Sequence, residues 1–143
     1  MIGREDFDEQ PAPDDLRFWQ LREPPRSATY GNPVPVDVLL QHRDLTEEDL
    51  AHVTAVVADV DRYLTAAVDF VRQRMAEDPA FFGVEEPLDD VPLSGPAIAV
   101  NDDSWLVHFA EGLPICDPYG LAVHFRGDQP VEVEDLSDYE QIE

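Results

Sequence analysis

The sequence predicts an α+β protein, in which an antiparallel β-sheet of about five to six strands has one long amphipathic helix packed on one face. Three observations support this prediction. An apolar stripe with helical spacing runs along residues 50–75. Segments on both sides of it alternate apolar and polar residues, as half-buried strands do. Hydrophobic residues make up 43% of the 143 residues, which is enough for the core of one domain.

The helix is expected to begin after Thr46 and to end near Asp78. Thr46 is a suitable N-cap, and the three acidic residues after it lie where the helix dipole favours negative charge. Pro79 ends the helix, because a proline disfavours helical geometry at the residue before it. The span of about 32 residues corresponds to roughly 48 Å and leaves a bend or a split open. The apolar stripe consists of Leu50, Val53, Val56, Val57, Val60, Leu64, Ala67, Val68, Val71 and Met75.

Two strands are expected before the helix. Residues 17–22 are expected to form a short strand, which is stopped by Glu23, Pro24 and Pro25. Apolar side chains recur with period two in residues 34–41, as in a strand with one buried face. Pro35 has no N–H for a sheet ladder, so this strand is expected at an edge or after the proline.

A β-meander is expected after the helix, beyond an irregular segment that contains the apolar pair Phe81 and Phe82. Its strands are predicted at residues 97–100, 105–110, 121–126 and 131–133. The side chains expected to face the helix are Trp105, Val107, Phe109, Leu121, Val123 and Phe125. The opposite face is expected to carry His108, His124, Arg126, Glu132 and Glu134.

The chain divides into three parts by composition. Residues 1–16 contain six acids against Arg4 alone, and we expect an acidic flexible arm there. Residues 17–134 are expected to form the single α+β domain. Residues 135–143 are expected to form an acidic tail, because the acids that start at Glu132 continue to the last residue without a base.

The charge is strongly one-sided. The chain has 32 Asp and Glu and nine basic residues, all of them Arg, and its formal net charge is −23. Such a chain repels phosphate backbones and anionic membranes, so neither direct nucleic-acid binding nor membrane binding is expected. No apolar stretch approaches the roughly 18 residues of a membrane span, and residues 1–10 lack the features of a secretory signal. With Cys116 as the single cysteine, these observations favour a cytoplasmic protein.

Few residues are candidates for catalysis or metal binding. Cys116 lies between the predicted strands that carry His108 and His124, an order compatible with a thiol–imidazole pair for nucleophilic catalysis. The single cysteine and four histidines are scattered without paired spacing, so no metal and no cofactor is predicted. With 32 acids, a carboxylate pair by itself identifies no reaction. The sequence therefore favours a protein that is not an enzyme, with a small Cys116-dependent enzyme as an alternative.

The C-terminal third carries a strand-and-loop pattern. Its segments are Trp105–Phe109, Cys116–Phe125 and Pro130–Asp138, and the second contains the loop Asp117–Gly120. In this pattern the chain resembles the C-terminal half of small acidic α+β proteins encoded beside bacterial polymorphic toxins, which are immunity proteins or uncharacterised relatives. The resemblance is at the level of fold and includes no catalytic motif. It implies a cytoplasmic protein that binds and blocks a cognate toxin.

The predicted function is non-enzymatic binding of a basic protein, and the resemblance implies that this partner is a toxin. An acidic docking face would raise the association rate and set specificity. Two alternatives are an acidic nucleic-acid mimic or regulatory binding protein, and a charge that reflects only a halophilic or GC-rich source. The oligomeric state is left open. The residues expected to contact the partner are Glu132, Glu134, Asp135, Asp138, His108, His124 and Arg126.

Overall fold

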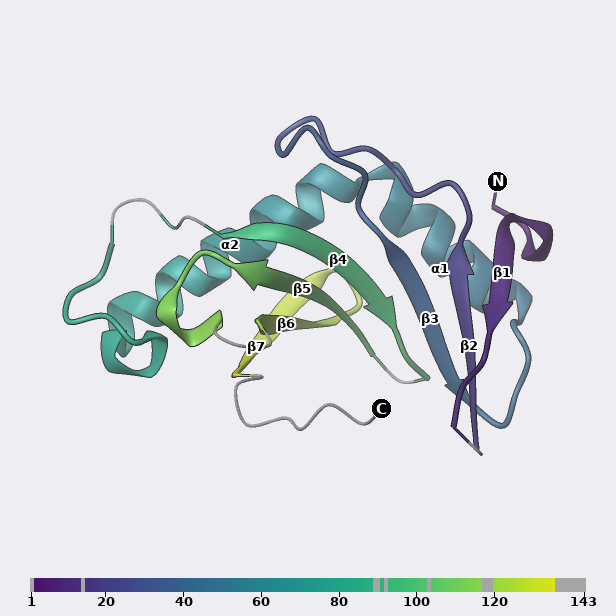
Figure 1. Cartoon of the computed structure of the whole chain (residues 1–143). Helices are drawn as coiled ribbons and strands as arrows, with labels where there is room; N and C mark the ends of the chain where they lie inside the picture. The colour runs from purple at the N-terminus through teal and green to yellow at the C-terminus, as the bar shows by residue number, and fades with distance from the viewer. Residues whose placement is uncertain are drawn as a thin grey trace.

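Seven strands form one sheet in sequence order (Figure 1). The structure is a computed structural model that describes residues 2–13, 15–88, 91, 93–102, 104–116 and 120–135, with the backbone alone at Asp135. Two helices, α1 (Glu47–Ala58) and α2 (Val60–Glu77), follow β3 in the chain and cover one face of the sheet. The strands are β1 (Phe7–Gln10), β2 (Leu16–Leu21), β3 (Val36–Gln41), β4 (Ser94–Val100), β5 (Trp105–Glu111), β6 (Leu121–Arg126) and β7 (Gln129–Asp135). Three short 3₁₀ helices are η1 (Arg4–Asp6), η2 (Pro79–Phe82) and η3 (Pro114–Cys116).

Neighbouring strands are antiparallel except β3 and β4, which are parallel. The chain leaves β3, crosses the sheet as α1 and α2, and enters β4 in the direction of β3. The predicted α+β class is confirmed, with strands on both sides of the helical region. The antiparallel sheet of about five to six strands is corrected to a mixed sheet of seven strands.

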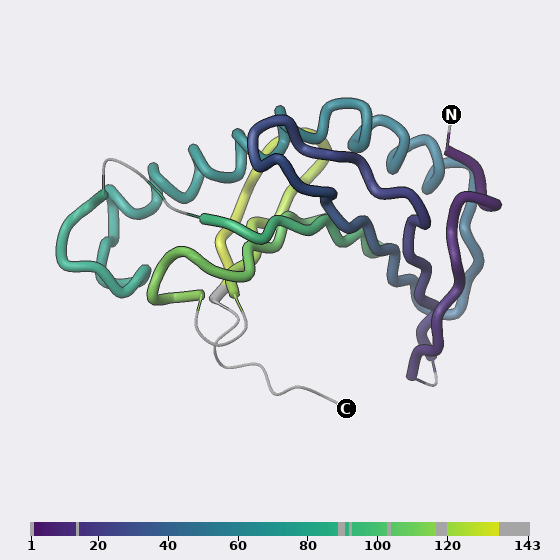
Figure 2. Tube along the Cα trace, turned by 45° about the horizontal axis from the view of Figure 1, so that its top comes forward, coloured from purple at the N-terminus to yellow at the C-terminus, as the bar shows by residue number. Residues whose placement is uncertain are grey.

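The single helix predicted after Thr46 is divided at Asp59 into α1 and α2. The apolar stripe continues through the break, because Val56 and Val60 are both buried. At Asp59 φ is −122° and ψ is 32°, and its N–H donates to the Val56 carbonyl at 3.2 Å. This bond spans three residues, as in a 3₁₀ turn, instead of four. Two shorter helices, instead of one straight rod, thus lie along the curved sheet (Figure 2).

Strand β1 lies within the segment that the sequence analysis assigned to a flexible arm, so the structure differs from that expectation. Phe7 is buried, and β1 pairs with β2. Two ion pairs of 2.9 Å join the strands, from Arg17 to Glu9 and from Arg22 to Asp8. The pattern was missed because only one of the four residues is buried, and the acids that indicate disorder are paired here. The folded region therefore begins before residue 17.

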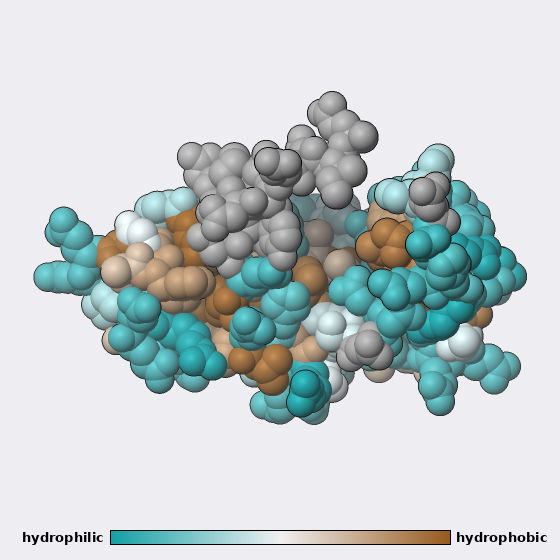
Figure 3. Space-filling view, turned by 90° about the horizontal axis from the view of Figure 1, so that it is seen from below, coloured by the Kyte–Doolittle hydropathy of each residue, from teal (hydrophilic) through white to brown (hydrophobic). Residues whose placement is uncertain are grey.

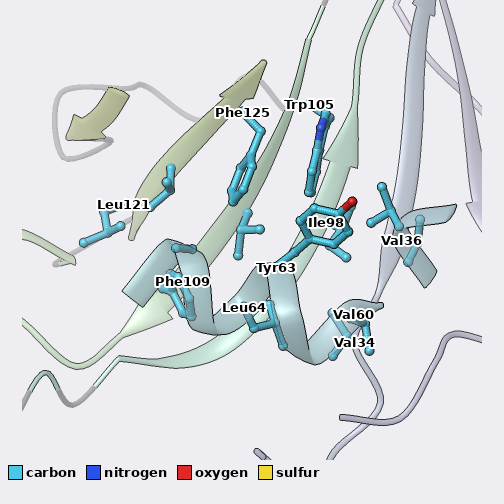
Figure 4. Close-up of a cluster of buried hydrophobic side chains, with 14 of the residues drawn as sticks. Val34, Val36, Val60, Tyr63, Leu64, Ile98, Trp105, Phe109, Leu121 and Phe125 are labelled. Atoms are coloured by element: carbon cyan, nitrogen blue, oxygen red, sulfur yellow. The ribbon is translucent and has the colours of Figure 1, made fainter. Parts of the chain in front are cut away.

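The core lies between the helices and the sheet (Figure 4). Trp105 stacks on Phe125 with 4.3 Å between ring centroids. Tyr63 of α2 meets both rings edge-on, at 5.0 Å from Trp105 and 5.9 Å from Phe125. The side chains predicted to face the helix from β5 and β6 are all buried: Trp105, Val107, Phe109, Leu121, Val123 and Phe125.

An ion-pair network joins the start of α1 to the sheet. Arg43 lies 2.6 Å from Asp49 in the first turn of α1 and 2.7 Å from Asp102, which follows β4. Asp49 also forms a capping box with Thr46, whose N–H donates to the Asp49 carboxylate at 2.8 Å. Burial favours the neutral form of Asp49, but hydrogen bonds from Arg43 and Thr46 outweigh it and hold the pKa of Asp49 below its usual value.

We expect Asp49→Asn to lower the free energy of unfolding by about 2 kcal/mol at pH 7, because it removes the charge that Arg43 contacts. The folded pKa of Asp49 lies below the unfolded value of about 3.9. The charge therefore stabilises the fold above that value, and its contribution is lost as the pH falls through the folded pKa. Urea unfolding at pH 7 and pH 3 should show the difference between wild type and variant shrinking at pH 3.

The control is Asp69→Asn, which removes an exposed partner of Arg72 and should change the free energy of unfolding by less than about 0.5 kcal/mol. An Asp49→Asn effect of equal size at both pH values would contradict the ion-pair explanation.

Candidate functional site

The sheet face opposite α1 and α2 has no helix over it in the part of the chain that the structure describes (Figure 2). Figure 3 shows the molecule from this side, where apolar and hydrophilic side chains lie beside one another. Residues that alternate with the core positions of each strand point to this side. We call it the open face, and it includes Asp37, Leu39, Ala97, Ala99, Leu106, His108, Ala122, His124, Glu132 and Glu134.

Four of the predicted partner-binding residues come together on the open face. His124 of β6 is the cross-strand partner of Glu132 on β7. In the adjacent row, Ala122 is the partner of both His108 on β5 and Glu134 on β7. His124 Nε2 lies 2.8 Å from Glu134 Oε1, so the two rows are in contact. We call His108, His124, Glu132 and Glu134 the carboxylate patch.

The other predicted site residues are placed less fully. Arg126 is exposed at the end of β6, two residues from His124 and thus on the same side of the strand. Asp135 ends β7, and its side chain lies outside the described residues. Asp138 lies outside the described residues altogether. The predicted site is therefore described at five of its seven side chains.

Next to the carboxylate patch, the open face has a row of side chains that are partly shielded from water. Asp37 is half-buried, and burial raises the pKa of its carboxyl group, while a hydrogen bond with Gln20 partly offsets this effect. Its cross-strand neighbour is Ala99, and the next residue in that row is Leu106. The open face thus combines apolar side chains with carboxylates. Protein-binding surfaces have a similar composition, with an apolar centre and a polar rim.

Most of the arginines are already engaged within the chain. The ion-paired arginines in the described structure are Arg4, Arg17, Arg22, Arg43, Arg62, Arg72 and Arg74. The chain has 32 acids and nine arginines, so its negative charge exceeds the positive charge of the arginines by 23. The negative field of the surface is therefore balanced by water, by salt ions or by a basic partner.

A groove of about 240 Å³ lies beside β7, which has β6 as its only neighbour in the described sheet. The groove is formed by three elements, which are the C-terminal end of α2, the short helix η2 and the strand β7. No pattern in the sequence predicts this groove, because the elements that form it are distant in the chain. The apolar pair in η2 was its only signal. The groove is lined by Arg74, Glu77, Asp78, Phe81, Phe82, Glu132 and Val133.

Cys116, the candidate nucleophile, is buried at the end of η3, with 2% of its surface exposed. The N–H of Gly120 donates to the carbonyl oxygen of Cys116. A catalytic thiol must reach a substrate, so this burial disfavours the Cys116-dependent enzyme.

Other kinds of site find no support in the described residues. Among them, no group of three or more His, Cys, Asp or Glu is arranged to hold a metal ion. No helix that the structure describes is long and apolar enough to span a membrane. Comparison with known proteins gives no match to a family model, to a curated protein or to a solved structure.

Proposed function

We propose that this protein is a non-enzymatic, acidic protein-binding domain, and that it acts as an immunity protein that occludes a cognate bacterial toxin with a basic active site. The observation that carries the proposal is the carboxylate patch, which lies on the open face, where the described residues place no helix, in a chain with a net charge of −23. Inhibition in this proposal is steric and electrostatic.

The position of Glu134 supports the proposal. Its contact with His124 at 2.8 Å orients the carboxylate, yet 32% of the side chain stays exposed. An oriented carboxylate loses little conformational freedom when it binds a cation. Charge-assisted hydrogen bonds from Arg or Lys to such a group are stronger than neutral ones.

The overall charge supports a basic partner. Long-range attraction between opposite charges raises association rates by a factor of about 10 to 1,000. A toxin that acts on nucleic acid presents Arg and Lys to the substrate phosphates, and in our proposal the patch carboxylates take the place of those phosphates. The same attraction weakens in salt, which makes the proposal testable.

Capture of the partner is the first experiment. The tagged chain is incubated with lysate of its source organism, and the retained proteins are identified by mass spectrometry after low-salt and high-salt washes. We expect the tagged chain to retain one basic protein in stoichiometric amount, and we expect salt to weaken the binding of that protein. Expressed alone, that protein should arrest growth, and co-expression of the acidic chain should restore growth. A captured protein that never arrests growth would contradict the immunity role and leave protein binding in place.

We expect the double variant Glu132→Gln/Glu134→Gln to lower the association rate constant for the captured protein by about tenfold, because it removes two charges from the patch. The salt dependence of that rate constant should also flatten. Stopped-flow or surface-plasmon measurements at several salt concentrations provide the test.

The control is Glu47→Gln/Glu48→Gln, which changes the net charge equally but lies at the exposed start of α1 on the covered side. It should leave most of the association rate constant intact. Equal slowing by both double variants would show that the patch is not the binding site.

A further inference from the structure

The groove beside β7 has an apolar floor and a charged rim. Phe81 is 43% exposed and meets the buried ring of Phe82 edge-on at 5.1 Å. We call the apolar lining residues Phe81, Phe82 and Val133 the floor of the groove, and its charged lining residues, among them Asp78 and Glu132, its rim. Apolar surface that is exposed to water is unfavourable, and the free energy falls when another apolar group covers it.

Phe81 is one of the few large apolar side chains that are exposed in the described structure. Among the described residues, the exposed large hydrophobic side chains are Phe81, Leu88 and Val131. Val131 lies in the bulged part of β7, directly before Glu132. Leu88 donates its backbone N–H to the sulfur of Met75 in the last turns of α2. Of these three side chains, Phe81 lines the groove, whereas Leu88 and Val131 do not. An exposed apolar surface that is bordered by polar residues is typical of interaction sites.

The charge at the rim favours a basic occupant. Among the described residues, the groove is lined by the carboxylates of Glu77, Asp78 and Glu132 and by the guanidinium of Arg74. Arg74 lies 3.7 Å from Glu77 and over the ring of Phe70, so its charge is already in contact with partners in the chain. The rim therefore carries excess negative charge around an apolar floor.

The size of the groove fits one side chain. Its volume of about 240 Å³ lies below the roughly 300 to 1,000 Å³ of small-molecule sites. Protein interfaces often contain one aromatic anchor that fills a pocket of one side chain, with polar contacts around it.

We infer that the groove receives one aromatic side chain from a basic segment of the partner protein, with neighbouring Arg or Lys residues of that segment contacting Asp78 and Glu132. Glu132 belongs to both the groove and the carboxylate patch, so the two surfaces are continuous. The inference rests on the proposed function and gives that partner an anchor residue.

The test uses three synthetic peptides and nuclear magnetic resonance titration of the ¹⁵N-labelled protein. The first is Gly-Arg-Arg-Trp-Arg-Arg-Gly, the second has Ala in place of Trp, and the third has Glu in place of every Arg. We expect the first peptide to shift the amide signals of Phe81, Phe82 and Val133 in a saturable way. The second should bind about tenfold more weakly, because it lacks the anchor. The third should not bind.

In the protein, the substitution Phe81→Ala should lower the affinity for the first peptide by about fivefold or more, because it removes the exposed aromatic ring of the floor. Leu88→Ala is the matched control, since Leu88 is also an exposed apolar residue but does not line the groove. It should leave the affinity unchanged. If Phe81→Ala unfolds the protein, the comparison of the Trp and Ala peptides on the wild type still decides.

Each contrary outcome has one meaning. Equal binding of the Trp and Ala peptides would show attraction by charge alone, which overturns the groove and leaves the proposed function in place. A second contrary outcome is that no peptide binds while the captured protein still binds in a salt-sensitive way. This result would overturn the inference about the groove and leave the proposed function in place. Self-association in sedimentation velocity that Phe81→Ala abolishes would make a second copy of the chain the occupant and overturn the inference.

Discussion

Replacing Trp105 by alanine is expected to lower the free energy of unfolding by about 3 to 5 kcal/mol, the largest effect of any substitution considered for this protein. Trp105 is 1% exposed, and its ring packs against Phe125 and Tyr63. Its Nε1 donates to the carbonyl of Gly127 at 2.7 Å, which holds the β6–β7 turn against β5. Alanine would leave a cavity where these contacts meet. Urea unfolding followed by far-ultraviolet circular dichroism measures the loss, and the melting temperature should fall by roughly 10 °C.

The control is Trp105→Phe, which keeps a ring beside Phe125 and loses the hydrogen bond and part of the volume. It should cost about 1 to 2 kcal/mol. A cost below about 1 kcal/mol for the alanine variant would contradict the described packing between α2 and the sheet.

Gly120→Ala is expected to lower the free energy of unfolding by about 2 to 4 kcal/mol. Gly120 has a φ of 92°, a conformation that residues with a side chain rarely adopt. A Cβ atom there would overlap the carbonyl oxygen of Phe109 and lie 2.6 Å from Nε2 of His108. The first of these atoms belongs to the backbone of β5, which is paired with a strand on each side, so it has little room to move. Thermal and urea unfolding of the variant provide the measurement.

Gly127→Ala separates the two causes. Gly127 also has a positive φ, of 63°, but nothing lies within 4 Å of the position of its Cβ. Gly127→Ala should therefore lower the free energy of unfolding by about 1 kcal/mol, through conformational strain alone. If the two alanine variants lost the same free energy, the overlap at Gly120 would not contribute.

The sequence predicted the parts of the fold that have a regular buried face. The large apolar residues of β5 and β6 recur at every second position, so the side of the sheet on which they lie followed from period two. Period two did not predict the burial of Ala122, which lies on the opposite side of β6. The helical stripe was equally clear, because its buried side chains repeat every three or four residues.

The missed features depend on contacts between distant segments. Strand β1 has one buried side chain, and the ion pairs that join it to β2 come from residues the sequence does not mark as partners. The break at Asp59 does not interrupt the apolar stripe, because Val56 and Val60 on either side of it are both buried, so the hydrophobic pattern does not reveal it. The parallel pairing of β3 with β4 is likewise set by how the helices cross the sheet.

The candidate site shows the same division. Alternation along β6 and β7 predicted that His124 and Glu134 share a face. Their contact at 2.8 Å depends on the strand register and on the irregularity after His124, which alternation does not determine. The groove needs η2 and β7 side by side, and no local pattern in either element indicates the other.

The parallel pair β3–β4 has a consequence for how the protein folds. Within β1–β3 and within β4–β7, each strand pairs with the strand that precedes or follows it in the chain. The partners Val36 and Ile98 are instead separated by both helices. Closing so long a loop costs chain entropy before any contact repays it. We therefore expect the two meanders to form early and to join late, so that one long-range step at β3–β4 sets the folding rate of the whole sheet.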